Sequence, residues 1–135
     1  MTNFVYDKGR EGFLNGQINW TGDTIKVVLV DTASYTPNQA SHQYLSDIAS
    51  GARTFISGAL TGKGSAAGVA SAANLTMTGV TGNQSEALVI FKDTGNAATS
   101  NLICYLDTVG SGLPVLPNGG PIIITWFTGG AIFKL

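Results

Sequence analysis

The sequence predicts an all-β, mainly antiparallel fold, a β-sandwich or jelly-roll-like domain with one or two short helices. Short apolar runs rich in β-branched and aromatic residues recur along the chain, and clusters of Gly, Pro, Asn and Asp separate them. No long helical segment lies between these runs, which favours antiparallel pairing over a parallel sheet. At 135 residues the chain is long enough for one hydrophobic core, so residues 1–135 are expected to form a single domain.

The clearest element is a hairpin formed by the runs 87–91 and 102–106. The segment between them contains Asp93, Gly95 and Asn96, residue types that favour a chain reversal. Both alternating sets of side chains in the first run are apolar, so neither face is marked as the one that meets water. We therefore expect this hairpin at the centre of the sheet, with both of its faces covered.

Residues 7–14 favour one short helix. Asp7 is an acceptable N-cap, and Gly16 follows at the point where the helix would end. Phe13 and Leu14 are expected to form its inward stripe. Two internal glycines each cost ~1 kcal/mol relative to Ala, so this helix needs support from the sheet or from a neighbouring subunit.

The remaining strands are expected where short apolar runs lie between turn residues. These runs are 24–30, 53–56, 69–77, 122–127 and 131–135, with a weaker start of pairing at 17–20. Residues 32–47 have no sustained period, which predicts a structured loop ending in a turn of helix near 42–48. The run 122–127 is the most apolar of the chain, and we expect it to be integral to the sandwich. The alternative is an arm donated to another subunit.

Residues 57–73 consist almost entirely of Gly, Ala and Ser, with Lys63 as the single charged residue. Such a tract buries little apolar area, so it is expected to be a long flexible loop in the isolated subunit. Its small residues allow close backbone approach, which predicts that a neighbouring subunit orders it.

The composition is low in charge. Charged residues make up 11% of the chain, against roughly 25% in an ordinary soluble domain. This deficit favours a protein that covers much of its surface with other subunits, and the alternative is a monomer with a Ser, Thr, Asn and Gly surface. The net charge of -1, with scattered cations, argues against a nucleic-acid partner. No apolar run approaches the ~20 residues that span a membrane, and the first residues do not resemble a signal peptide.

Few residues suggest chemistry. His42 is the only histidine and lies in no metal-binding spacing, so we expect it to be hydrogen-bonded locally in its loop. Cys104 has no disulfide partner and is expected to be a buried, unreactive strand residue in a protein of a reducing compartment. Trp20 and Trp126 offer surfaces for stacking a sugar, although core or interface tryptophans are more common. We expect neither enzymatic activity, nor a metal, nor a cofactor.

Several segments form a recognisable series along the chain: FVYDKGREGFLNGQINW, DTIKVVLVDTASYTPN, HQYLSDI, ALVIFKDTG, LPVLPNGGPIIITWFTGG and IFKL. In these segments the chain resembles a widespread family of small virion proteins of tailed bacteriophages. Its most specific parts are VVLVDT with the YTPN turn, and LPNGG followed by ITW. Pro121 departs from the polar residue that the family has after the glycine pair. The resemblance implies a particle component with no enzymatic role, located in the virion and assembled in the host bacterial cytoplasm.

Composition and resemblance together predict a capsid cement or decoration subunit that stabilises the assembled head. Its expected partners are other copies of itself and the major capsid protein or other virion proteins. The alternatives are a tail, neck or baseplate component and, from a different class, a carbohydrate-binding module of an adsorption apparatus. The residues expected at the subunit interface are aromatic, adjoin an aromatic residue or lie in the Gly/Ala/Ser tract: Phe4, Val5, Tyr6, Trp20, Lys63 and Trp126.

Overall fold

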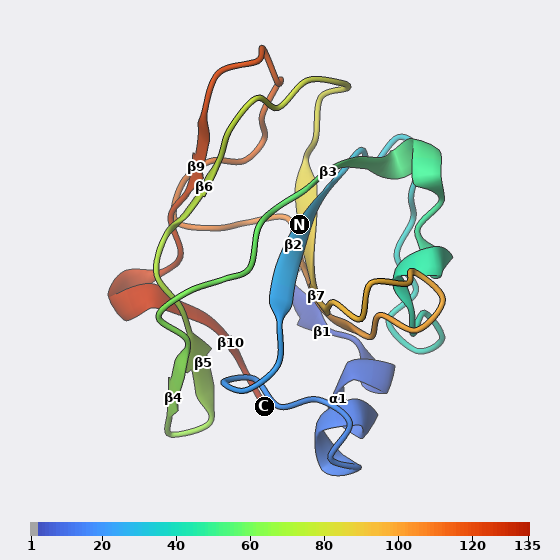
Figure 1. The fold of residues 1–135 in the computed structure, drawn as a ribbon, viewed down its shortest axis with the longest axis vertical. Coiled ribbons are helices and arrows are strands. Elements are labelled where there is room, and N and C mark those ends of the chain that lie inside the picture. The colour runs from blue at the N-terminus through green and yellow to red at the C-terminus, as the bar shows by residue number, and fades with distance from the viewer. Residues whose placement is uncertain (1–2) are drawn as a thin grey trace.

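A five-stranded antiparallel sheet forms the centre of the protein (Figure 1). The computed structural model describes residues 3–135. The strand order is β1-β8-β7-β2-β3. The bounds are β1 (Phe4–Val5), β2 (Ile25–Val30), β3 (Arg53–Ile56), β7 (Ala87–Lys92) and β8 (Leu102–Leu106). The predicted hairpin is β7 and β8, and β7 is the middle strand, which confirms its expected central place.

Two smaller sheets lie against one face of the central sheet. The first has the order β10-β5-β4 and the second pairs β6 with β9. Their bounds are β4 (Gly64–Ala66), β5 (Val69–Ser71), β6 (Leu75–Met77), β9 (Ile122–Ile124) and β10 (Ala131–Lys134). One α-helix, α1 (Asp7–Leu14), and the 3-10 turns η1 (Leu45–Asp47), η2 (Ser50–Ala52) and η3 (Thr128–Gly130) complete the described residues. The all-β prediction with a few short helices is therefore confirmed.

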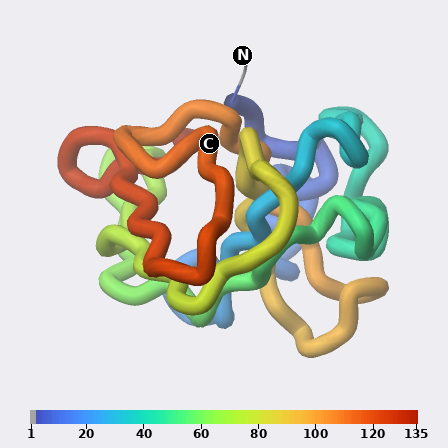
Figure 2. Tube along the Cα trace, turned by 90° about the horizontal axis from the view of Figure 1, so that it is seen from above, coloured from blue at the N-terminus to red at the C-terminus, as the bar shows by residue number. Residues whose placement is uncertain are grey.

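The two faces of the central sheet are covered by different parts of the chain. Seen from above, the small sheets lie on one side of the central strands and residues 31–52 lie on the other (Figure 2). The first core, between the central sheet and the small sheets, receives Leu88 and Ile90 of β7. The second core, on the opposite face, receives Val89 and Phe91 of the same strand. The period of two in β7 therefore serves two buried faces, as its sequence predicts.

Helix α1 approaches the main chain of β8 because its two internal glycines are buried. A Cβ atom on Gly9 would lie 2.8 Å from the carbonyl oxygen of Ile103, so the close approach requires glycine there. The prediction was wrong in two details. The N-cap is Tyr6 and not Asp7. Leu14 does not face inward, since its side chain is 85% exposed.

The Gly/Ala/Ser tract is not a long loop, and this prediction was wrong. It contains the hairpin β4–β5, whose two-residue turn places Ala67 and Gly68 at φ values of 53° and 80°. Indole N–H groups bind its main chain: Trp20 donates to the carbonyls of Gly64 (3.1 Å) and Ser71 (3.2 Å). Backbone pairing with β10 and these indole bonds hold a segment whose own side chains bury little area.

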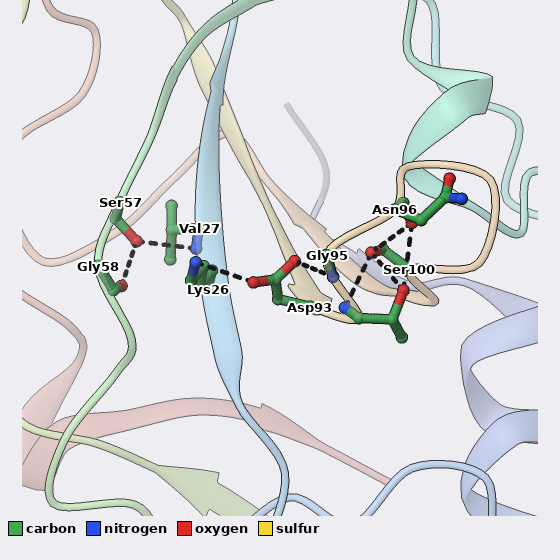
Figure 3. A network of polar contacts seen from close by, with 9 residues as sticks. Lys26, Val27, Ser57, Gly58, Asp93, Gly95, Asn96 and Ser100 are labelled. Carbon is green, nitrogen blue, oxygen red and sulfur yellow. Dashed lines mark hydrogen bonds and ion pairs between the residues drawn. The ribbon is translucent and has the colours of Figure 1, made fainter.

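Polar side chains continue the pairing of β2 beyond the end of β3, as Figure 3 shows. The Val27 N–H donates to Ser57 Oγ (3.0 Å), and this hydroxyl donates to the Gly58 carbonyl (2.7 Å). On the same strand Lys26 forms an ion pair with Asp93 at 2.8 Å. Buried Ser57 thus supplies the partner that the main chain of β3 does not provide.

Other boundaries differ from the sequence expectations. Residues 17–20 form no strand, although Ile18 and Trp20 are buried. The expected strand 69–77 is divided into β5 and β6, which belong to different sheets. In the C-terminal run only 122–124 pair as β9, with partners on β6 of the same chain. The expected helical turn near 42–48 is η1.

Candidate functional site

The most prominent surface feature is an apolar groove where α1, β10 and the β4–β5 hairpin meet. It consists of two hollows of about 570 and 330 Å³ that share Phe13 and Leu135 in their lining. The main apolar residues that line the groove are Phe13, Leu14, Ile18, Trp20, Phe133 and Leu135. We call it the α1–β10 groove.

The floor of the α1–β10 groove is aromatic and held in place. The ring of Phe133 lies 5.2 Å from that of Trp20 in an edge-to-face arrangement and 6.1 Å from that of Phe13. The two main-chain bonds of the Trp20 indole fix this ring in turn. A partner that binds here therefore meets a preorganised apolar surface, and little conformational entropy is lost from the groove on binding.

The rim of the groove exposes apolar side chains to solvent. Leu14 is 85% exposed and Leu135 54% exposed. Arg10 lines the smaller hollow, where its Nη1 donates to the Val5 carbonyl (3.2 Å). Lysines and acids of α1 form only exposed ion pairs beside it, which contribute little to stability. The groove can bury apolar side chains of a partner.

The residues that the sequence proposed for a subunit interface lie mostly inside the chain. Val5, Tyr6, Trp20 and Trp126 are buried, and Trp20 alone also lines the groove. Phe4 is half-buried, and its ring stacks on that of Tyr105 at 5.2 Å. Lys63 is half-buried, and its Nζ donates to the Asp23 carbonyl. The six residues do not gather on one surface.

The sequence reasoning did not find Leu14, Phe133 and Leu135 as groove residues. Leu14 was expected to face inward, and β10 was expected to be an ordinary core strand. One signal was present, because the helix was expected to need a neighbour for support. The pairing of Phe13 with Phe133 joins opposite ends of the chain, so it becomes visible only in the folded structure.

The two tryptophans have internal roles. Trp126 is 2% exposed, and its indole N–H donates to the Ala73 carbonyl (2.9 Å). Trp20 is 7% exposed, with its indole N–H shared between two carbonyls. Neither ring presents an open face on which a sugar could stack.

His42 and Cys104 lie as the sequence predicted. His42 accepts a bond from the Asn38 N–H at its Nδ1 (3.2 Å) and contacts the Tyr35 hydroxyl there (2.8 Å). Cys104 is buried in β8, and burial raises the pKa of its thiol. Within residues 3–135 no group of three or more His, Cys, Asp or Glu side chains is arranged to hold a metal ion. In the same part of the chain, no helix has the length and apolar character needed to cross a membrane.

No protein-family model matches this chain, and the curated proteins contain no match to it. The functional interpretation therefore rests on the residues and on the surface described above.

Proposed function

We propose that the protein is a structural subunit of a tailed-bacteriophage particle, a cement or decoration subunit bound to the outside of the assembled head. The observation that carries its role in assembly is the α1–β10 groove, a preorganised apolar surface with exposed leucines at its rim. The sequence resemblance to small virion proteins supports the choice of particle. The partners are the major capsid protein or other virion proteins, and other copies of this chain.

The energetics of the groove favour burial by a partner. Each Å² of apolar surface removed from water contributes about 25 cal/mol. Aromatic residues in rigid, concave surroundings are typical anchors of protein interfaces. The scarcity of charge, at 11% of residues, lowers the number of ionic groups that must lose water on assembly.

Electron microscopy of intact particles tests the proposal. Density for the subunit is expected on the outer face of the head, with the α1–β10 groove against a neighbouring protein. Density on the tail, neck or baseplate would replace the head assignment with that alternative. Absence of the protein from purified particles would contradict a structural role altogether.

A pair of leucine variants tests the groove itself. Leu14→Asp places a charge at the groove rim, and Leu116→Asp places one on an exposed leucine outside it. Because both side chains are exposed, both variants are expected to fold. Particles should lose at least about 90% of the Leu14→Asp subunit, a tenfold or ~1.4 kcal/mol effect on binding. They should retain the Leu116→Asp subunit. Equal retention of the two variants would contradict binding through the groove.

The carbohydrate-binding alternative predicts a different result. Specific glycan binding by the isolated protein on an array would support an adsorption module and count against the cement role. We expect no glycan signal, since the two indole rings are covered.

A further inference from the structure

A chain of three hydrogen-bonded side chains connects the start of α1 with the loop that follows β2. The Tyr6 hydroxyl lies 2.8 Å from the Tyr35 hydroxyl, which lies 2.8 Å from His42 Nδ1. The Asn38 main-chain N–H also points at this nitrogen, at 3.2 Å. The rings of Tyr35 and His42 stack at 5.4 Å. The chain thus joins residues 35–42 to the second core, in which Tyr6 and Tyr35 are buried.

The direction of the bonds is fixed by the Asn38 N–H. A main-chain N–H only donates, so His42 Nδ1 must accept, and the imidazole is neutral with its proton on Nε2. Tyr35 therefore donates to His42, and Tyr6 donates to Tyr35. In this arrangement each hydroxyl donor has an acceptor.

Protonation of His42 is incompatible with this arrangement. A proton on Nδ1 faces the Asn38 N–H, and it forces the Tyr35 hydroxyl to accept instead of donate. Tyr35 must then turn its hydrogen toward Tyr6, whose own hydrogen loses its acceptor. Tyr6 is fully buried, and its hydroxyl has Tyr35 as its one hydrogen-bond partner within residues 3–135. Acid thus leaves two donors without partners, one of them buried.

The groups around His42 offer its charged form another partner. The Asp47 carboxylate of η1 interacts electrostatically with His42 and accepts the N–H groups of Gln43 (2.7 Å) and Tyr44 (3.0 Å). The other titratable groups on this side are the hydroxyls of Tyr6 and Tyr35, and Tyr105 of β8 beside both of them. On the α1 side, Arg10 and Gln39 donate to one carbonyl, that of Val5. The arrangement therefore has one acceptor for an imidazolium, Asp47, and one cation opposing it, Arg10.

We propose that His42 is an acid-sensitive latch on the cover of the second core. When neutral, it holds residues 35–42 against Tyr6. When protonated, it gives up Asn38 and Tyr35, turns toward Asp47 and frees this segment from the start of α1. The central sheet and the first core remain closed, because neither contributes a group to this chain of bonds.

Amide hydrogen exchange at pH 8 and at pH 5.5, corrected for intrinsic exchange rates, tests the latch. Protection of residues 33–44 is expected to fall at least tenfold at the lower pH, while protection of β7 and β8 stays constant. Nitrogen chemical shifts of the imidazole should show the Nε2–H tautomer at pH 8.

The matched control is His42→Asn, which places an oxygen acceptor near the position of Nδ1 and does not titrate. Residues 33–44 of this variant should remain equally protected at both pH values. Unchanged protection in the natural protein would overturn the proposal. An equal loss in His42→Asn would also overturn it, because another group would then be the sensor. An Nδ1–H tautomer at pH 8 would contradict the assigned bond directions.

Discussion

The two faces of the central sheet are closed in different ways. Small sheets cover the first core with aliphatic side chains and tryptophans. The irregular segment 31–52 covers the second core, where Tyr6 and Tyr35 bury hydroxyl groups and bond one another. Strands of the first cover satisfy their own main chain by pairing, whereas the second cover depends on particular side-chain bonds. The first face should therefore fail when apolar area is lost, and the second when ionisation changes.

Removal of the C-terminal strands should have the largest effect. A chain that ends at Pro121 loses four buried side chains of the first core: Ile122, Ile124, Trp126 and Ile132. Burial of each contributes roughly 1.5 to 3 kcal/mol, and the sum is comparable to the ~5 to 15 kcal/mol that stabilises a domain. We expect no cooperative thermal transition.

Deletion of Leu135 alone, which is exposed, is the control and should leave the transition in place. A cooperative melt of the Pro121 chain near the full-length value would instead mean that these strands act as an arm for another subunit.

High pH should selectively weaken the second face. Burial raises the pKa of Tyr35 to about 12, and burial together with Tyr35 raises the pKa of Tyr6 as well. Above pH ~10 the unfolded chain releases tyrosine protons that the folded chain keeps. Unfolding is then favoured, so this stability is complete below pH ~10 and is lost as the pH rises toward 12. The expected loss is about 2 to 3 kcal/mol.

Urea unfolding at pH 9, 10 and 11 measures this decline. Tyr35→Phe is the matched variant, and its stability should fall less steeply over the same range. A flat profile for the natural protein would show that the second face does not depend on neutral tyrosines.

The contact of α1 with β8 should depend on the absence of a single methyl group. Gly9→Ala adds a Cβ at 2.8 Å from the Ile103 carbonyl oxygen, and main chain cannot move aside as a flexible side chain does. We expect a loss of about 1 to 3 kcal/mol despite the better helix propensity of alanine. Gly51→Ala is the control, because nothing lies within 4 Å of its added Cβ. Chemical denaturation that gives equal stabilities for the two variants would contradict the close packing.

The smallest expected effect is a gain. Ala67 has a φ of 53° in the β4–β5 turn, a conformation that asparagine and glycine adopt more readily than alanine. Ala67→Asn should therefore stabilise the protein by about 0.5 to 1 kcal/mol in chemical denaturation. The same substitution at Ala66, an exposed strand position, should give no gain. A loss at Ala67 would indicate a different turn.

The sequence was informative where alternation dictates structure. The pattern of 87–106 predicted the central hairpin and its two covered faces, because each apolar side chain marks its own face. The β4–β5 hairpin was missed because the information that orders it lies elsewhere in the chain, in the indole groups of Trp20 and Trp126. The α1–β10 groove was missed because Leu14 lies at the last turn of a short helix, where a small change in helix direction decides between burial and exposure.

The indole bonds also have a consequence for how the sequence can change during evolution. Because the β4–β5 hairpin is recognised through its main-chain carbonyls, replacement of one small residue by another alters none of the atoms that hold it. Related chains are therefore expected to drift freely through this tract while selection retains Trp20. The least conserved stretch of the protein would then lie directly over one of its most constrained side chains.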